Sequence, residues 1–332
     1  MRIIENEREA LMECPDTIDH TAGSLLDECD RAYYYFVIRG LRPVYERDYF
    51  ISGKAWDRAL GRLNDSTLDK ADRLTQARLA IRETWAHSKC EYVHENRAPD
   101  NLIHLLDLFI ENYGFDHEYE ILESNIYFRF PYKDFFIGGE IDAYIDWPGL
   151  GVIADENKTT NGVISDAYLA GFFLGGYANQ LKTYNWACRQ ITENLWGNRV
   201  NIASLAIPKR KSTQRTLFQS LLIQPPEQEI LDVLELYERR MGRLRENWKL
   251  WSWPKCGTHC EGGWGFSACD YRFICKISTR LGEEEVIPQQ YRVADWRPWE
   301  GQKGDWEGLS SAEKAEIEER AGGSSAYEED SD

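Results

Sequence analysis

Apolar residues recur at helical spacing through most of the first third of the chain. Positions three and four residues apart carry the apolar side chains, as on the buried face of an amphipathic helix. Glycines, prolines and polar clusters interrupt this pattern and mark the helix boundaries. The pattern predicts four helices, over residues 23–40, 53–63, 69–86 and 101–113.

The spacing changes to that of extended strands after residue 118. Ile, Tyr, Phe and Val become frequent, and turn-forming residues at 131–134 and 148–149 divide the segment. We predict three consecutive antiparallel strands, over residues 119–130, 135–147 and 151–158. The pattern then predicts a helix over residues 166–189, a strand pair over 200–207 and 216–223, and a charged helix over 226–248. The order α-β-β-β-α-β-β-α indicates an α/β fold, with a mixed sheet flanked by helices.

These elements divide the chain into four parts. We expect a helical N-terminal part at residues 1–98, a core at 99–250, a cysteine-rich loop at 251–280 and an acidic tail at 281–332. The tail is poor in β-branched residues and carries Gly and Ser near its end. We therefore expect it to be largely disordered, with at most a short helix over residues 311–320.

The net charge of −17 is concentrated towards the C-terminal end. Fifteen acidic and five basic residues fall between Gly282 and Asp332, so the rest of the chain is only mildly acidic. Such a body can bind nucleic acid through a local cleft. No stretch has the roughly 20 apolar residues of a membrane span, and the charged N-terminal segment does not resemble a signal peptide. We expect a cytoplasmic protein without a membrane partner.

Two acidic residues and a lysine stand where strand geometry can bring them together. Asp142 lies in the second predicted strand, and Glu156 and Lys158 lie at the end of the third. Residues two apart in a strand point to the same face, so Glu156 and Lys158 project together while Asn157 points away. A short hairpin can bring Asp142 beside them. Carboxylates that hold Mg²⁺ or Mn²⁺, with a lysine that orients water or stabilises charge, suit the hydrolysis of a phosphodiester.

This arrangement resembles the signature of the PD-(D/E)XK nuclease superfamily, specifically its RecB-like exonuclease branch. In that branch a Gln-x-x-x-Tyr motif follows on a helix, and Gln180 and Tyr184 stand four apart in the helix predicted over residues 166–189. The branch also opens with a helix that carries Ser-x-Leu, a cysteine and aromatic residues, which are matched by Ser24, Leu26, Cys29 and the Tyr33, Tyr34, Tyr35 run.

The resemblance implies a restriction-endonuclease-like fold and a divalent-metal-dependent DNA nuclease, more often an exonuclease acting on ends or single strands. Asp142, Glu156 and Lys158 would form the catalytic centre, and Gln180 and Tyr184 would position the substrate or the lysine. Relatives serve DNA replication, recombination or repair and are often phage-encoded, so a helicase or recombination partner and a bacterial or phage-infected host cytoplasm are implied. The alternative is a catalytically silent DNA-binding or accessory subunit that keeps the fold.

One position departs from the pattern of the branch. Its Gly-x-x-x-His helix motif supplies a histidine metal ligand, and here Gly53 is followed by Asp57 in that place. A carboxylate also binds Mg²⁺, so metal preference would shift towards harder ions. The alternative is that Asp57 is a solvated helix residue paired with Arg58 or Arg62. The metal ligands implied by the resemblance are Asp57, Asp142, Glu156 and Asn157.

Half of the eight cysteines crowd into one loop, at Cys256, Cys260, Cys269 and Cys275. Crowded cysteines in a chain without an export signal indicate a metal site. RecB-like nucleases with an iron-sulfur cluster take one cysteine from the N-terminal helix and three from a C-terminal loop that ends in Cys-x5-Cys. The resemblance implies a [4Fe-4S] cluster that fastens the chain's end to its beginning, held by Cys29, Cys260, Cys269 and Cys275, with Cys256 as the alternative to Cys260. The alternative is a local structural Zn²⁺ held by Cys256, His259 or Cys260, Cys269 and Cys275.

The densest basic patch lies in the turn between the two late strands. Lys209, Arg210 and Lys211 stand there together. In the fold that the resemblance implies, they would lie within reach of the active site and contact DNA phosphates. The alternative is a solvated hairpin turn.

Overall fold

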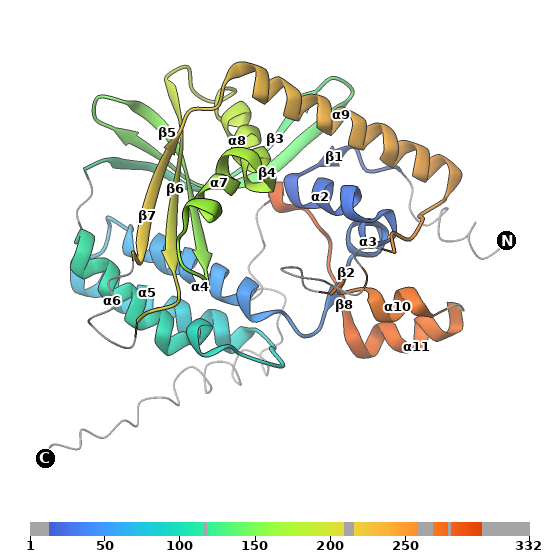
Figure 1. Ribbon diagram of the computed structural model, residues 1–332, viewed down its shortest axis with the longest axis horizontal. Coiled ribbons are helices and arrows are strands. Elements are labelled where there is room, and N and C mark those ends of the chain that lie inside the picture. Colours follow the sequence, from blue (N-terminus) through green and yellow to red (C-terminus); the bar gives the residue numbers. More distant parts are fainter. Residues whose placement is uncertain are drawn as a thin grey trace, which may run out of the picture.

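The computed structural model describes residues 13–115, 118–208, 216–257, 260, 268–277 and 280–300. Within these ranges a mixed sheet forms the centre of the molecule, with helices on both of its faces (Figure 1). The strands run in the order β1-β4-β5-β6-β7, and β3 pairs with β4 beside that path. Their bounds are β1 Thr17–Ile18, β3 Glu120–Tyr132, β4 Phe135–Trp147, β5 Gly151–Thr160, β6 Leu195–Ser204 and β7 Phe218–Ile223.

The three central strands that the sequence predicts are confirmed. β3 and β4 pair antiparallel through a tight turn, in which Lys133 has a φ of 54°. β4 and β5 also pair antiparallel, and Gly149 and Gly151 adopt the positive φ angles of their connecting turn. β6 then joins β5 in parallel, and β7 returns antiparallel to β6. The sheet is therefore mixed, as the order of elements indicates.

The sheet is interrupted along one edge of β4. One edge of β4 pairs with β3 over almost the whole length of the strand. On the second edge, β1 pairs with Phe136 and Ile137, and β5 begins to pair only at Ala143. Among the described residues, no strand neighbours residues 138–142 on that edge. The run GGEID, from Gly138 to Asp142, lies in this interruption, where the backbone has no neighbouring strand on that edge among the described residues.

Helices cover the two faces of the sheet. α4 (Asp48–Leu63), α5 (Lys70–His87) and α6 (Pro99–Tyr113) pack on one face, and α7 (Asp166–Leu174) and α8 (Gly176–Cys188) pack on the other. Successive side chains of β6 point to opposite faces of the sheet. Ala203 therefore packs with α4, α5 and α6, whereas Val200 and Ile202 pack with α7 and α8. α9 (Glu227–Leu250) lies along α2 and α8 at the top of the view (Figure 1).

Two of the predicted helices are broken in the structure. The segment over residues 23–40 divides into α2 (His20–Glu28), α3 (Asp30–Tyr33) and a π-helical turn at Tyr34–Ile38, because Cys29 adopts an extended backbone. The segment over residues 166–189 divides at the extended Gly175, where a Cβ atom would lie only 2.9 Å from the Gly171 carbonyl oxygen. Apolar side chains continue on both sides of each break, so their spacing did not reveal it.

The beginning and the end of the described chain pack together. β2 (Leu41–Pro43) pairs antiparallel with β8 (Tyr291–Val293), and α10 (Arg272–Lys276) and α11 (Arg280–Gln290) lie on the same side of the molecule as α3 (Figure 1). Residues 280–300 thus differ from the disordered tail that the sequence led us to expect at 281–332. Their apolar side chains explain this, since Trp296 packs against Phe36. Residues 301–332, with the predicted helix at 311–320, lie outside the described residues.

The largest apolar core joins α2, α3, α8 and α9 to the sheet. Tyr33 and Tyr35 are fully or almost fully buried in it, so these rings contribute to packing. Short 3-10 turns at Glu95–Arg97 and Pro298–Glu300 complete the described elements. None of the helices in the described ranges combines the length and the apolar character that crossing a membrane requires.

Candidate active site

Asp142 and Glu156 meet at the interruption in the sheet. The ladder between β4 and β5 ends at the pair formed by Ala143 and Asp155, so Asp142 and Glu156 are the first residues beyond it. Asp142 Oδ2 accepts the backbone N–H of Asn157 at 2.7 Å. Because both carboxylates follow a paired position, they face the same side of the sheet and line one cavity.

Lys158 joins this pair from the same face of β5. Its Nζ forms an ion pair with Glu156 Oε1 and lies 5.7 Å from the centre of the Tyr177 ring. Burial opposes the charged amine, but the carboxylates of Glu156 and Asp142 outweigh burial and raise the pKa of Lys158 to about 12. The side chain is therefore a fixed positive charge at neutral pH.

Asp57 reaches the same site from α4. Its Oδ1 accepts a hydrogen bond from Asn157 Nδ2 at 3.1 Å, whereas Arg58 donates to Thr84 at 3.4 Å. Pairing with a neighbouring arginine is therefore not the arrangement that the structure shows for Asp57. Asp57, Asp142 and Glu156 come from three different elements and converge on one cavity.

Asn157 lies between Glu156 and Lys158 in sequence but points to the other face of β5, as strand alternation predicts. Both ends of its amide are engaged, because Nδ2 donates to Asp57 and Oδ1 accepts from Asn201 Nδ2 at 3.3 Å. Its backbone N–H is engaged as well, with Asp142. Asn157 therefore connects two carboxylates, and its role as a metal ligand stays a prediction.

A cavity of about 430 Å³ opens where these groups meet. Gln180 and Tyr184 lie one turn apart on α8 and form part of its wall, and Gln180 Nε2 donates to the Tyr184 hydroxyl at 2.8 Å. The structure thus brings the predicted Gln-x-x-x-Tyr motif to the predicted carboxylates. The other polar or charged lining residues include Asp19, His20, Lys54, Arg58, Asn125 and Glu140.

Burial and the crowding of like charges dominate the electrostatics of this cavity. Burial, followed by repulsion from Asp57 and Glu156, raises the pKa of Asp142 well above its ordinary value. Burial likewise raises the pKa of Glu156, of Asp57 and of Glu140. Glu156 Oε2 is buried and has no hydrogen-bond partner among the described residues. A buried oxygen of this kind is costly, and a cation bound to it would offset the cost.

The donor set fits a hard divalent cation. Its ligands would be carboxylate oxygens, which Mg²⁺ and Mn²⁺ prefer. Within the part of the chain that the structure describes, no three His, Cys, Asp or Glu side chains stand as a ready-made metal site. A bound cation would therefore draw Asp57, Asp142 and Glu156 closer together than they stand.

Two features of the cavity did not enter the sequence interpretation. Glu140 precedes Asp142 by two positions, so the alternation of β4 could have placed it on the same face. Trp296 also lines the cavity and donates from Nε1 to Asp19 Oδ1 at 2.8 Å. No local pattern indicates this second contact, because it joins residues from opposite ends of the chain.

Cys29 lies at the break between α2 and α3, beside the C-terminal loop. Its Sγ accepts the backbone N–H of Cys256 at 3.4 Å. Burial raises the pKa of Cys269 to about 11, and the nearby thiols of Cys260 and Cys29 add to the rise. Burial also raises the pKa of Cys275, again with contributions from Cys29 and Cys260. The four predicted cysteines therefore lie in one region of the molecule.

Some predicted site residues cannot be placed. Lys209, Arg210 and Lys211 lie outside the described residues, as does His259. The predicted DNA contact at the turn between β6 and β7 therefore stays a prediction.

The family to which the chain belongs follows from a match to a family model. The model of the PD-(D/E)XK nuclease superfamily matches residues 20–276. The chain belongs to this superfamily. Nucleases of the PD-(D/E)XK superfamily typically use divalent metals such as Mg²⁺, and the mixed sheet flanked by helices is consistent with their restriction-endonuclease-like fold.

Two further comparisons add no argument about function. No curated protein matches the chain. One solved structure, described as the crystal structure of SSO0001, is 16% identical, with 72% of this chain and 84% of that chain covered and a TM-score of 0.31. So low a structural similarity leaves the family match as the finding that supports the PD-(D/E)XK assignment.

Proposed function

We propose that this PD-(D/E)XK protein is a divalent-metal-dependent deoxyribonuclease that removes nucleotides from DNA ends. The observation that carries the proposal is the convergence of Asp142 and Glu156 on one cavity, with Lys158 ion-paired to Glu156. Glu156 supplies a buried carboxylate, Asp142 a partly buried one, and Lys158 a partly buried ammonium ion. Acidic oxygen ligands beside a fixed cation suit the hydrolysis of a phosphodiester bond.

Asp142 and Glu156 would hold the divalent cation, with Asp57 as a further ligand. When bound, Mg²⁺ or Mn²⁺ supplies Lewis-acid polarisation of a phosphoryl oxygen. Asn157 acts as a positioning residue, because its backbone N–H holds Asp142 and its side-chain amide holds Asp57. The two carboxylates are therefore oriented from one residue, which lies between the proposed ligand Glu156 and Lys158.

The protonation state of Lys158 defines its role. The carboxylates of Glu156 and Asp142 raise its pKa to about 12, so it is an ammonium ion at neutral pH. It donates hydrogen bonds that orient the attacking water or stabilise the negative charge that develops on the phosphate. Gln180 and Tyr184, hydrogen-bonded to each other on α8, orient the substrate or this lysine.

We further propose that Cys29, Cys260, Cys269 and Cys275 hold a [4Fe-4S] cluster. Four thiolates satisfy such a cluster, and the contact of Cys29 Sγ with the backbone N–H of Cys256 in the C-terminal loop supports a site that includes the N-terminal cysteine. A zinc site made only of loop residues would leave the approach of Cys29 to Cys256 without a role. The cluster would fasten residues 254–277 to the start of α3.

The exonuclease role rests on the resemblance to the RecB-like branch. The same resemblance is the basis for proposing a role in replication, recombination or repair, a phage origin, a helicase partner and a cytoplasmic location. An assay on linear, circular and single-stranded DNA, with Mg²⁺, Mn²⁺ or EDTA, tests the function. Degradation of linear DNA that EDTA stops, with circular DNA left intact, is the expected result. Binding of DNA without any cleavage would instead identify a silent accessory subunit.

A further inference from the structure

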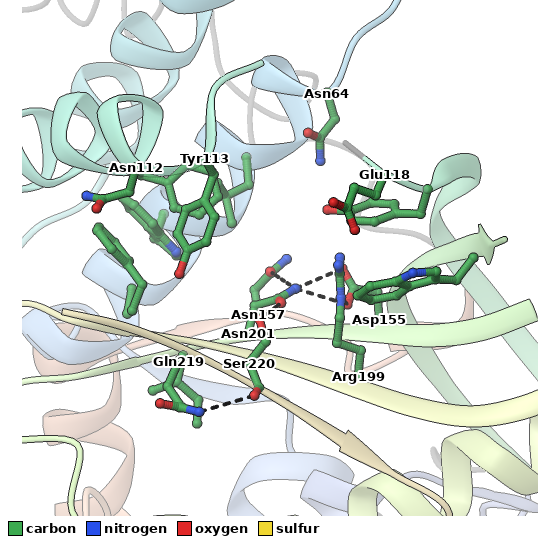
Figure 2. Close-up of a pocket in the computed structure, with 18 residues that line it drawn as sticks. Asn64, Asn112, Tyr113, Glu118, Asp155, Asn157, Arg199, Asn201, Gln219 and Ser220 are labelled. Atoms are coloured by element: carbon green, nitrogen blue, oxygen red, sulfur yellow. Dashed lines mark hydrogen bonds and ion pairs between the residues drawn. The ribbon is translucent and has the colours of Figure 1, made fainter. Parts of the chain in front are cut away.

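A second and larger cavity lies on the other face of β5. It measures about 660 Å³, within the roughly 300–1,000 Å³ that small-molecule sites occupy. Figure 2 shows that Asn64 and Tyr113 reach into it from the helices, opposite Asn157 and Asn201 on the strands. This cavity is separate from the one that holds Glu156, because Asp155 and Asn157 point to the opposite face of the strand.

The side chains that line this cavity are mainly aromatic rings and amides. The aromatic residues are Trp56, Phe109, Tyr113, Tyr119, Trp147 and Phe218. The amide residues are Asn64, Asn112, Asn157, Asn201 and Gln219. Aromatic faces stack on nucleobases, and side-chain amides form paired hydrogen bonds with base edges. The lining thus matches the chemistry of a nucleobase.

The charges in this cavity argue against a phosphate as its occupant. Arg199 is its one cation among the described lining residues, and Asp155 neutralises it through two hydrogen bonds of 2.6 and 2.8 Å. The Arg199 guanidinium also lies 4.0 Å from the centre of the Tyr119 ring. Glu118 adds a further negative charge. An uncharged base is therefore favoured over an anion, and an exposed carboxylate can accept from the amino group of a base.

A third cavity shares lining residues with this cavity and with the candidate active site. Its volume is about 460 Å³, and it shares Asp57 and Asp142 with the active-site cavity. It shares Asp155 and Asn157 with the larger cavity. The exposed Arg58 and Arg62 on α4 supply positive charge in this third cavity, beside the carboxylates of Asp57, Glu83, Asp142 and Asp155. These two arginines are the phosphate contacts available to a strand that passes between the other two cavities along α4.

A hydrogen-bonded chain of side chains also links the two cavities. Asn157 Nδ2 donates to Asp57 at 3.1 Å, and Asn201 Nδ2 donates to Asn157 Oδ1 at 3.3 Å. Asn201 Nδ2 also donates to Asp155 at 2.9 Å. A proposed metal ligand is thus connected through two amides to the wall of the second cavity.

We propose that this second cavity binds one unpaired nucleobase of the strand whose phosphodiester lies at Asp142 and Glu156. The proposal rests on the nuclease function and extends it to a subsite that recognises a base. Tyr113, whose side chain is 50% exposed, stacks on that base, and Phe218 supports the Tyr113 ring edge-on with the ring centres 5.9 Å apart. Gln219 contacts the edge of the base. The bound base then fixes which phosphodiester of the strand lies at the active site, because the two sites are a fixed distance apart.

Abasic scanning tests this proposal. A series of labelled single-stranded DNA oligonucleotides, each lacking one base at a different position, is bound to the full chain with Ca²⁺ as the cation. We expect one position at which removal of the base weakens binding roughly 5- to 150-fold, which is the range for loss of one stacked base. In Tyr113→Ala and in Gln219→Ala, which change opposite walls of the cavity, that positional effect should disappear.

Tyr45→Ala is the matched control, because Tyr45 and Tyr113 are both 50% exposed and Tyr45 lines none of the three cavities. This variant should keep the positional effect. Equal binding of every abasic strand to the unmodified protein would overturn the proposal, as would a positional effect that survives in both cavity variants. Failure of the nuclease function shows separately, as the absence of Mg²⁺- or Mn²⁺-dependent cleavage by a protein that still shows the positional effect.

Discussion

Asn157 donates its backbone N–H to Asp142 Oδ2 at 2.7 Å, at the position where the β4 and β5 strands stop pairing. A hydrogen bond from main chain to side chain here replaces the next rung of the ladder. It directs the Asp142 carboxylate of β4 towards β5, beside Glu156. Two residues that are fourteen positions apart in the sequence are thereby brought to one cavity.

Substitution of Asp142 should separate stability from activity. Asp142→Asn removes a partly buried charge that Asp57 and Glu156 repel, and the amide oxygen can still accept from Asn157. Without added metal, thermal unfolding at neutral pH should show a gain of about 0.5–2 kcal/mol. DNA cleavage should fall on the order of 100-fold or more. Asp146→Asn, an exposed change on the same strand, serves as the control, and a destabilised Asp142→Asn would contradict the account.

Stabilisation by Mn²⁺ should depend on pH. Burial raises the pKa of Asp57, Asp142 and Glu156 in the folded state. Their contribution to the stability of the metal-free protein is therefore full below the unfolded pKa, near 4, and is lost as pH rises through the folded pKa. Mn²⁺ binds the ionised carboxylates, so it should raise the melting temperature more at pH 8 than at pH 5. Equal shifts at the two pH values would count against a carboxylate site.

The Asp155 and Arg199 pair should matter for stability far more than a surface pair. Arg199→Met leaves the Asp155 carboxylate buried without its ionic partner, which typically costs about 3–5 kcal/mol. Arg245→Met, which breaks an exposed arginine pair with Asp134, should cost no more than about 1 kcal/mol. Urea unfolding measures both changes. Similar losses of unfolding free energy in the two variants would contradict a larger contribution from the buried pair.

The cysteine proposal predicts a coloured protein whose colour depends on Cys29. Protein purified without oxygen should contain iron and absorb broadly in the visible range. Cys29→Ser should lose the iron and the colour and unfold more easily, because the link between residues distant in sequence is lost. Cys90→Ser should retain both, since Cys90 is not one of the four proposed ligands and its thiol donates to the Tyr92 carbonyl. Zinc without iron in the unmodified protein would rule out the cluster.

The sequence was sufficient for the central strands and for the residues that meet at the cavity. Strand alternation determines that Glu156 and Lys158 share a face, and the helical period determines that Gln180 and Tyr184 do. The spacing of apolar residues did not reveal the break at Cys29 or the one at Gly175. Each break depends on the backbone of one residue, which leaves the surrounding periodicity unchanged.

The contacts of the C-terminal segment could not be predicted in the same way. Trp296 packs on Phe36 and bonds to Asp19 because β8 pairs with β2, and strand pairing over such a separation has no local signal. The aromatic and amide cavity also depends on tertiary structure, since its walls come from strands and helices that are distant in sequence. The acidic composition of residues 281–332 predicted a disordered tail and gave no sign that residues 280–300 pack on the rest of the chain.

The most direct measurement is the rate of linear DNA degradation by Lys158→Ala with Mg²⁺ or Mn²⁺. Loss of the partly buried ammonium ion beside Glu156 should reduce the rate on the order of 100-fold or more, while circular dichroism shows a folded protein. Lys182→Ala, which alters a lysine paired with Glu229 on α9, should stay active. A folded Lys158→Ala protein that degrades DNA at the unmodified rate would contradict the assignment of this site.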